Sequence, residues 1–154
     1  MAEDAPLFLA APPRFGDGVH AAAEMEHAVL EADGIDTLVL RYGWLYGPGT
    51  YFGSDGATAF DVRRRRFPVI GKGSGLFSFI HADDAAAATV GAVERGAPGV
   101  YNVADDEPAP MREWLPAYAS TIGAKRPRRI PAWLARIRSP SWPSWRAGFQ
   151  EAPR

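Results

Sequence analysis

Residues 35–50, IDTLVLRYGWLYGPGT, constrain the fold of this chain more than any other stretch. The unbroken apolar run LVL at 38–40 is typical of a strand buried on both faces, as in a parallel sheet that helices cover. The strand predicted over residues 35–42 runs into aromatic side chains and then breaks on a Gly-Pro-Gly sequence. This break fits an ordinary proline turn packed by aromatic rings. It equally fits a loop in which glycine lets a flat ligand approach the backbone.

Strand and helix patterns alternate along the rest of the chain. Two strands joined by a Gly-rich loop are expected within residues 67–81, and another strand at 99–103. Helices are expected over residues 19–32, 57–66 and 83–95, and from Pro110 and Pro131 onward. The alternation predicts the α/β class, with helices flanking about four short strands. A doubly wound nucleotide-binding sheet normally has more strands than that.

Apolar side chains at helical spacing indicate which face of each helix turns inward. The stripes expected to be buried are Ala22, Met25, Val29 and Ala32; Ala86, Val90 and Val93; and Met111, Leu115, Tyr118 and Ile122. Asp83 or Asp84 is expected to cap the helix that follows it. The predicted organisation is an irregular segment at 1–17, a globular α/β unit at 18–138 and a Pro/Ser/Trp-rich tail at 139–154.

Composition excludes several classes of protein. The chain has no cysteine, so disulfides and thiolate metal sites are excluded, and a reducing, cytoplasmic location is expected. No window approaches the ~20 apolar residues of a membrane span, so a membrane partner is not expected. The acidic N-terminus does not resemble a secretory signal.

Charge is distributed unevenly along the chain. Residues 125–154 hold eight Lys or Arg and one acid, a balance of +7, whereas residues 1–124 hold nine and seventeen, a balance of −8. A basic tail fits a nucleic-acid or phosphate ligand, and it equally fits docking on the acidic body. No RNA-binding or DNA-binding motif accompanies the tail, so nucleic acid is the lesser alternative.

Three stretches make the chain similar to a known family: VLRYGWLYGPGT, FPVIGKGSGLFSFIHADDAAAATVGAVERG and GVYNVADDEPAPMREWL, in this order. Over residues 19–135 the chain resembles the C-terminal half of extended or atypical short-chain dehydrogenases/reductases, the NAD-dependent epimerase/dehydratase family. The resemblance implies a Rossmann-like sheet with NAD or NADP across its carboxyl edge, and a nucleotide-sugar-like substrate. It also implies that Tyr42, Gly43, Trp44 and Leu45 lie beside the nicotinamide.

The resemblance implies substrate contacts at Tyr46, Arg66 and His81. Tyr46 continues the aromatic stretch that forms the expected nicotinamide wall. Arg66 ends a run of four arginines, which suits a diphosphate and equally suits the solvated face of a short helix. His81, which precedes Asp83 and Asp84, fits a substrate-positioning group or the corner that opens a helix. No catalytic residue is assigned.

Two functional features of the family are missing from this sequence. The Gly-rich segment at 71–75 has the wrong spacing for the G-x-G-x-x-G fingerprint and lies between two expected strands. Gly18 and Ala22 occupy the positions that the resemblance gives to the family's Tyr and Lys, so the usual proton-transfer pair is absent. The sequence therefore predicts a truncated Rossmann-like fold that lacks the N-terminal dinucleotide-binding βαβ unit.

The expected function is that of part of an NAD(P)-dependent epimerase/dehydratase-type protein, inactive or weakly active as this chain and binding the dinucleotide weakly or not at all. The alternative is a non-catalytic binding or oligomerisation module, because a sheet cut on one side offers the edge of the 35–42 strand to a partner chain or a second copy. Glu24 and His27 match a Glu-x-x-His metal pattern, but no second copy of the pattern exists, so no metal is expected.

Overall fold

The computed structural model describes Leu7, Leu9 and residues 13–138, so the predicted tail at 139–154 and most of the predicted segment at 1–17 lie outside the described residues. The helices are α1 (Pro13–Leu30), α2 (Ala57–Arg63), α3 (Ala82–Arg95), α4 (Met111–Thr121) and α5 (Ala132–Arg138). The strands are β1 (Leu38–Tyr42), β2 (Trp44–Tyr46), β3 (Val69–Ile70), β4 (Leu76–Phe77), β5 (Phe79–His81), β6 (Gly99–Val103), β7 (Ala109–Pro110) and β8 (Arg129–Ile130). In this part of the chain no helix is long and apolar enough to cross a bilayer.

The strands of the described part pair two by two. β1 and β6 are parallel, from Leu38 opposite Gly99 to Tyr42 opposite Val103. The β2–β5 and β3–β8 pairs are also parallel, and the β4–β7 pair is antiparallel. At Gly43 the chain changes partner. The Gly43 N–H donates to the carbonyl of Val103, the last residue of β6, at 2.9 Å, and the next N–H donates to the carbonyl of Ser78, just before β5, at 2.8 Å. Gly43 therefore joins the two longest parallel pairs.

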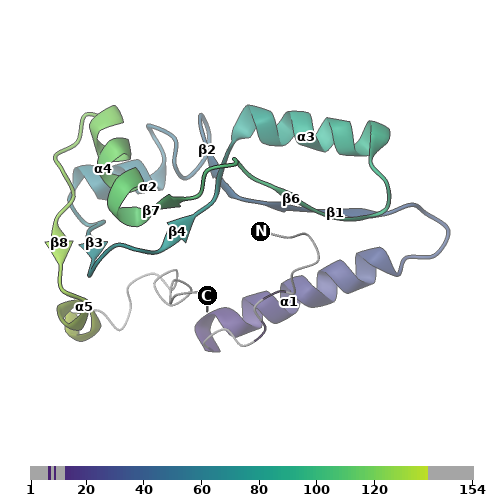
Figure 1. Ribbon diagram of the computed structural model, residues 1–154, viewed down its shortest axis with the longest axis horizontal. Coiled ribbons are helices and arrows are strands. Elements are labelled where there is room, and N and C mark those ends of the chain that lie inside the picture. The colour runs from purple at the N-terminus through teal and green to yellow at the C-terminus, as the bar shows by residue number, and fades with distance from the viewer. Residues whose placement is uncertain (1–6, 8, 10–12, 139–154) are drawn as a thin grey trace.

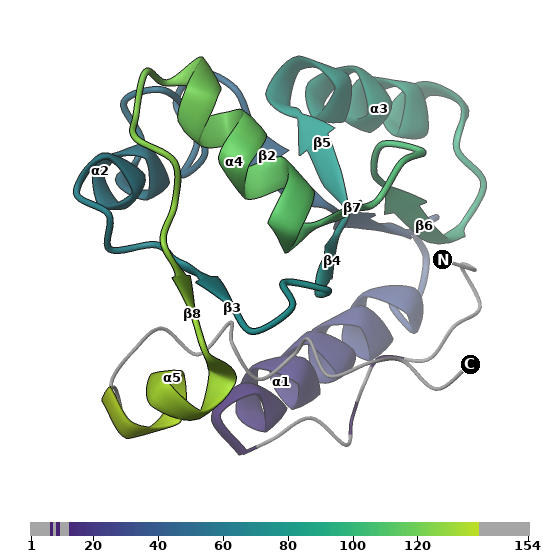
Figure 2. The same ribbon diagram turned by 60° about the vertical axis from the view of Figure 1, so that its left-hand side comes forward.

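Helices cover both faces of the β1–β6 pair. α3 lies on one face and α1 on the other (Figure 1). At the opposite end of the molecule, α4 packs on α2 and on β3 and β7 to form a second lobe (Figure 2). The arrangement confirms the predicted α/β, Rossmann-like class. More strands are present than the four predicted, because strands of two or three residues, such as β7 and β8, are too short to show a sequence period.

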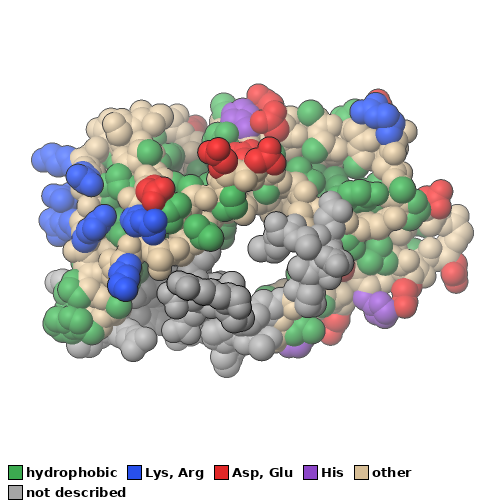
Figure 3. All heavy atoms as spheres, viewed as in Figure 1, with side chains coloured by type: hydrophobic (Ala, Val, Ile, Leu, Met, Phe, Trp, Pro, Cys, Tyr) green, Lys and Arg blue, Asp and Glu red, His purple; other side chains and the backbone are tan. Residues whose placement is uncertain are grey.

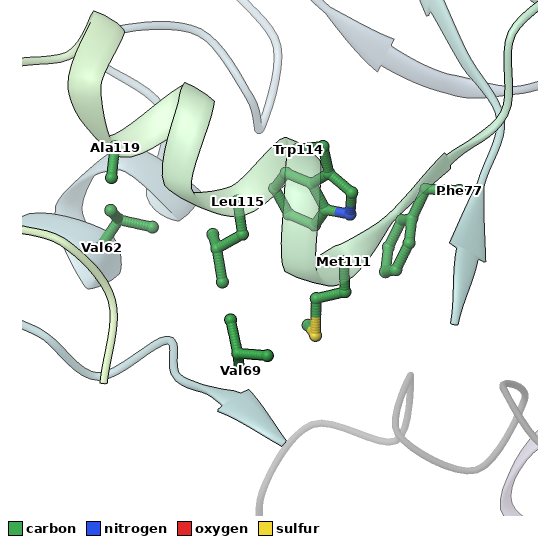
Figure 4. Packing of buried hydrophobic residues seen from close by; sticks show 7 residues of the cluster. All are labelled: Val62, Val69, Phe77, Met111, Trp114, Leu115 and Ala119. Atoms are coloured by element: carbon green, nitrogen blue, oxygen red, sulfur yellow. The ribbon is translucent and has the colours of Figure 1, made fainter. Parts of the chain in front are cut away.

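The hydrophobic core lies in the second lobe. Seven buried side chains from α2, β3, β4 and α4 point toward one another there (Figure 4): Val62, Val69, Phe77, Met111, Trp114, Leu115 and Ala119. By contrast, every residue of β1 and β6 is at least partly exposed. Residues 38–40 are therefore half-buried and not fully buried as predicted, although a helix lies on each face of the pair. β1 has one neighbouring strand within the described part of the chain, so its other edge stays open to solvent there.

The inward face of α4 agrees with the prediction. Met111 and Leu115 are buried, and Tyr118 and Ile122 pack against the core. The chain leaves the helix at Gly123, whose φ of +68° is the left-handed conformation that glycine adopts without strain. A regular apolar spacing closed by glycine was sufficient to place this helix and its face.

The inward face of α1 agrees with the prediction only in part. Ala22 and Val29 lie on the covered side, but Met25 is 63% exposed. Glu26 takes the inward place instead, because the guanidinium of Arg41 in β1 donates to its two carboxylate oxygens at 2.9 and 2.7 Å. A charged pair thus joins helix and sheet where an apolar contact was expected.

The predicted inward face of α3 is wrong. Ala86, Val90 and Val93 are exposed, the last two at 56% and 79%, and Ala85 is the buried residue of the helix. A sheet of two strands covers only a narrow strip of a helix, so the valine stripe beside that strip stays in solvent.

Replacing Glu26 by glutamine should lower the free energy of unfolding by about 1–2 kcal/mol at neutral pH, because Arg41 would lose two charge-assisted hydrogen bonds. The hydrogen bonds from Arg41 hold the pKa of Glu26 below its ordinary value of 4.5. A carboxylate with a lowered folded-state pKa stabilises above its ordinary pKa and loses that contribution as the pH falls through the lowered value. The difference between wild type and Glu26→Gln in urea unfolding should therefore shrink below pH 4.5.

Glu31, the residue directly after α1, provides the control for that prediction. It lies 3.1 Å from the His27 ring nitrogen with both side chains mostly exposed, so Glu31→Gln should change stability by less than about 0.5 kcal/mol. Equal losses in the two variants would contradict the assignment of Glu26 as the inward residue.

Candidate functional site

A first cavity of about 1070 Å³ opens at the carboxyl end of β1. Its lining includes residues 42–45, the four expected beside a nicotinamide, together with Tyr51, Phe52 and Ser78. No Asp, Glu, Lys or Arg is among the described residues that line it. Ligands of open α/β sheets bind outside the carboxyl ends of the strands, so the position and the lining suit a flat, uncharged ring.

The Tyr42 side chain in this wall is tied to α3. Its hydroxyl is hydrogen-bonded to the Thr89 hydroxyl, which in turn donates to the Ala85 carbonyl at 2.7 Å. Because the Thr89 proton is used in that second bond, Tyr42 is the donor of the first. The phenol therefore positions the wall and is not a free proton donor.

A second cavity of about 730 Å³ adjoins the first, and Phe52 lines both. The other aromatic side chains that line it are Tyr46, Phe79, Trp114 and Tyr118. Three carboxylates also line it: Asp55, Asp105 and Glu107. Tyr46, an expected substrate contact, thus lies in this cavity, next to the first cavity and its expected nicotinamide wall.

Burial and nearby carboxylates raise the pKa values of two titrating groups that line this cavity. Burial raises the pKa of the Tyr46 phenol, and the negative charges of Asp105 and Asp84 raise it further. Burial also raises the pKa of Asp105, as do Asp84 and Asp106, while His81 acts in the opposite direction. The family's proton-transfer tyrosine needs a lowered pKa. Tyr46 therefore holds its proton and can donate a hydrogen bond, but it does not replace the missing Tyr/Lys pair.

His81 lies at the corner that opens α3 and caps the helix, which corrects the expected cap at Asp83 or Asp84. Its Nδ1 accepts the Asp83 N–H at 3.2 Å, so the neutral ring has its proton on Nε2. The ring meets Tyr46 edge to face at 5.1 Å. The lining residues of the two cavities do not include His81. It packs behind the wall, close to Gly47.

Gly47→Ala should lower the free energy of unfolding by about 2 kcal/mol. The φ of Gly47 is +112°, which strains any side chain, and a Cβ there would lie 2.8 Å from His81 Nε2. Gly49→Ala is the matched control, since φ is +77° and a Cβ would meet nothing within 4 Å, so about 1 kcal/mol is expected. Denaturant unfolding of both variants measures the combined cost of the His81 contact and of the less favourable φ at Gly47. Equal losses in the two variants would contradict the prediction.

The arginine run 63–66 does not converge on either cavity. Arg66 is exposed and is absent from both linings. Arg63 donates to the Ser54 carbonyl at 2.7 Å, and Arg64 lies over the Phe60 ring at 4.2 Å. Lys and Arg side chains gather at the α2 and α4 end of the molecule, while acidic side chains gather around a histidine near the start of α3 (Figure 3).

Several lining residues were not predicted from the sequence. Asp105 and Glu107 lie in the loop after β6. Polar residues that follow a parallel strand lie near its carboxyl end, which was a usable signal. Phe52, Trp114 and Tyr118 gave no such signal, because apolar residues on helices and loops are ordinarily part of the core.

Parallel strand pairs with helices on both faces, and a cavity at the strands' carboxyl ends, define a Rossmann-like α/β protein. The chain belongs to the NAD dependent epimerase/dehydratase family, whose model matches residues 16–104. Among curated proteins it is similar to a 3-diazoavenalumate denitrifying reductase from a Streptomyces species. The two are 52% identical over 134 residues, which is 86% of this chain and 44% of the relative.

Two solved structures are also similar to this chain. A conserved protein of unknown function from Silicibacter pomeroyi is 26% identical with a TM-score of 0.63, and the match covers 88% of this chain and 44% of that protein. The UDP-glucose 4-epimerase of Thermus thermophilus, solved with NAD, is 27% identical with a TM-score of 0.54, over 85% and 47%. This chain thus spans less than half the length of each of these relatives.

Proposed function

We propose that this chain forms the substrate side of an NAD(P)-dependent reductase site and that, by itself, it binds the dinucleotide weakly. The observation that supports this most directly is the pair of cavities that share Phe52. The first has an uncharged aromatic wall suited to a nicotinamide ring, and the second, beside it, would take the substrate. The 52% identity to a protein named as a reductase favours reductive chemistry over epimerisation.

The residues present fit one part of a dinucleotide. The wall at 42–45 suits the ring, but neither lining includes a Lys or Arg among the described residues. The sequence also has no glycine fingerprint opening a helix, which is how pyrophosphate is held in this fold class. The dinucleotide, when bound, would supply the hydride, while this chain would orient the ring and shield the substrate from water.

A nucleotide sugar is the less suitable substrate. Its diphosphate would meet Asp55, Asp105 and Glu107 in the second cavity, where like charges repel. Of the three residues expected to contact a nucleotide sugar, Arg66 and His81 lie in neither lining. A flat organic molecule without phosphate groups suits the aromatic lining better.

A fluorescence titration with NADH and NADPH tests the cofactor part of the proposal. No saturation is expected in the micromolar range, because phosphate contacts supply much of a dinucleotide's affinity. The full-length Streptomyces relative is the control for the assay. Micromolar affinity in this chain would contradict the proposal.

A second candidate function is a docking module, and it is favoured by one observation. β1 pairs only with β6 within the described part of the chain, so its other edge has no strand. An unpaired parallel edge invites a further strand from a partner chain or a second copy. Sedimentation equilibrium tests self-association, and a monodisperse monomer would rule out the second copy.

A further inference from the structure

The floor of the second cavity is a cluster of aromatic rings that meet edge to face. The Phe52 ring lies 5.5 Å from Phe79, 5.8 Å from Trp114 and 6.2 Å from Tyr118, with interplanar angles of 86°, 79° and 71°. Aromatic faces are electron-rich and attract positive charge within about 6 Å. The floor therefore favours a flat ligand, and a cationic one over an anionic one.

The rim of the same cavity is acidic. Asp55 comes from the loop before α2, and Asp105 and Glu107 come from the loop between β6 and β7. Arg63 approaches this region, but its guanidinium donates to the backbone carbonyls of Ser54 and Ile122, at 2.7 and 3.5 Å, and is not in the lining. Three carboxylates thus face the cavity, against one nearby guanidinium, that of Arg63, whose charge opposes the burial that raises the pKa of Tyr118.

Both rim loops are attached to the aromatic floor. The Asp105 N–H donates to the Phe79 carbonyl at 2.6 Å, and the Tyr118 hydroxyl donates to the Gly53 carbonyl at 3.1 Å. These bonds fix the backbone of the two loops before a ligand arrives, which reduces the ordering cost of binding. Burial and the neighbouring carboxylates of Asp84 and Asp106 raise the pKa of Asp105, so negative charge in this region is already in excess.

We propose that the second cavity binds a flat organic cation, an aromatic or conjugated ring system that bears a quaternary or protonated nitrogen. The ring would lie on the aromatic floor, and the charge would face Asp105 and Glu107 at the rim. The inference rests on the proposed function only in taking this cavity as the place of the substrate. The preference for positive charge is a property of the cavity alone and needs no cofactor.

Calorimetric titration of the full 154-residue chain with matched probes tests the preference. The probes are N-methylquinolinium as the cation, quinoline as its neutral counterpart above neutral pH, and 2-naphthoate as the anion. N-methylquinolinium should bind about tenfold more tightly than quinoline, and 2-naphthoate more weakly than either. Equal affinities for cation and neutral ring, tighter binding of the anion, or no saturable binding of the cation would each overturn the proposal.

Paired variants distinguish this cavity from general attraction to an acidic surface. Asp105→Asn combined with Glu107→Gln should weaken N-methylquinolinium binding about tenfold and leave quinoline binding unchanged. The control combines Asp33→Asn with Asp36→Asn, which removes equal charge from the exposed loop after α1 and should change neither affinity. Equal effects of the two pairs would overturn the proposal.

The location of the probe has its own readout. Trp114 lines the cavity, and its indole nitrogen is buried without a hydrogen-bond partner among the described residues. Its NMR resonance, assigned by its loss in Trp114→Phe, should shift on adding N-methylquinolinium. Saturable binding without that shift would place the cation elsewhere and contradict the proposal. Neither the probe affinities nor the NMR shift depends on the outcome of the NADH titration. The cation-binding proposal and the proposed function can therefore be contradicted independently.

Discussion

Trp114→Ala should lower the free energy of unfolding by about 3–5 kcal/mol. The side chain is 8% exposed and sits at the centre of the second lobe, where its ring centroid lies 5.0 Å from Phe77 and 5.3 Å from Phe79. A loss of this size is a large part of the total stability of a domain of this length, about 5–15 kcal/mol. Guanidinium unfolding measures it, and a lower m-value would show that the native lobe has loosened as well.

Trp114→Phe is the matched control. The indole N–H makes no hydrogen bond to the described residues, so the phenyl ring loses some packing volume and no polar contact. About 1–2 kcal/mol is expected, which is the range of a modest reduction in volume. A loss as large as that of alanine would mean that the indole nitrogen has a partner that contributes to stability.

Gly43→Ala should cost about 3 kcal/mol and distort the first cavity, because the new side chain would meet backbone. A Cβ at Gly43 would lie 2.8 Å from the Ser78 carbonyl oxygen and 3.2 Å from the Ala104 Cβ. The strands must therefore separate where the chain passes from β1, which pairs with β6, to β2, which pairs with β5. Hydrogen exchange should then show loss of protection at the Gly43 and Trp44 amides, both of which donate across this junction.

Gly91→Ala makes the same chemical change but should have the opposite effect on the free energy of unfolding. Gly91 lies inside α3, where a Cβ would meet only the flexible end of the Arg95 side chain at 3.3 Å. Alanine in a helix interior should stabilise the protein by about 0.5–1 kcal/mol. If both substitutions were destabilising to the same degree, the close approach at Gly43 would not be the cause of its loss.

Prediction from the sequence succeeded where the signal is local and repeated. α4 has an apolar residue on every turn and a glycine at its end, so its position and its face were both predicted. The inward place of Glu26 could not be found in this way, because it depends on Arg41, fifteen residues further along the chain. The exposure of Val90 depends on how few strands cover α3, which no helix pattern encodes.

The candidate site shows the same difference between local sequence patterns and contacts between distant segments. Residues 42–45 are contiguous, and the structure brings all four to one cavity. The second cavity is built from β2, the loop after it, β5, the loop after β6, β7, and α4 with the residue after it. Tertiary structure brings these separate segments together, so no local sequence pattern marks the lining, and the resemblance alone implied a nucleotide sugar as the ligand.

A chimera tests most directly whether this chain is the substrate side of a reductase site. In this chimera, the segment of the Streptomyces reductase that matches this chain, at 52% identity over 134 residues, is replaced by the corresponding segment of this chain. The quantity to measure is kcat/KM for reduction of that relative's own substrate with NADH and with NADPH. We predict a value within about tenfold of the parent enzyme, and a loss of about a hundredfold when Trp44→Ala removes the wall of the first cavity. A folded chimera that binds NAD(P)H as tightly as the parent but reduces no substrate would contradict the proposal.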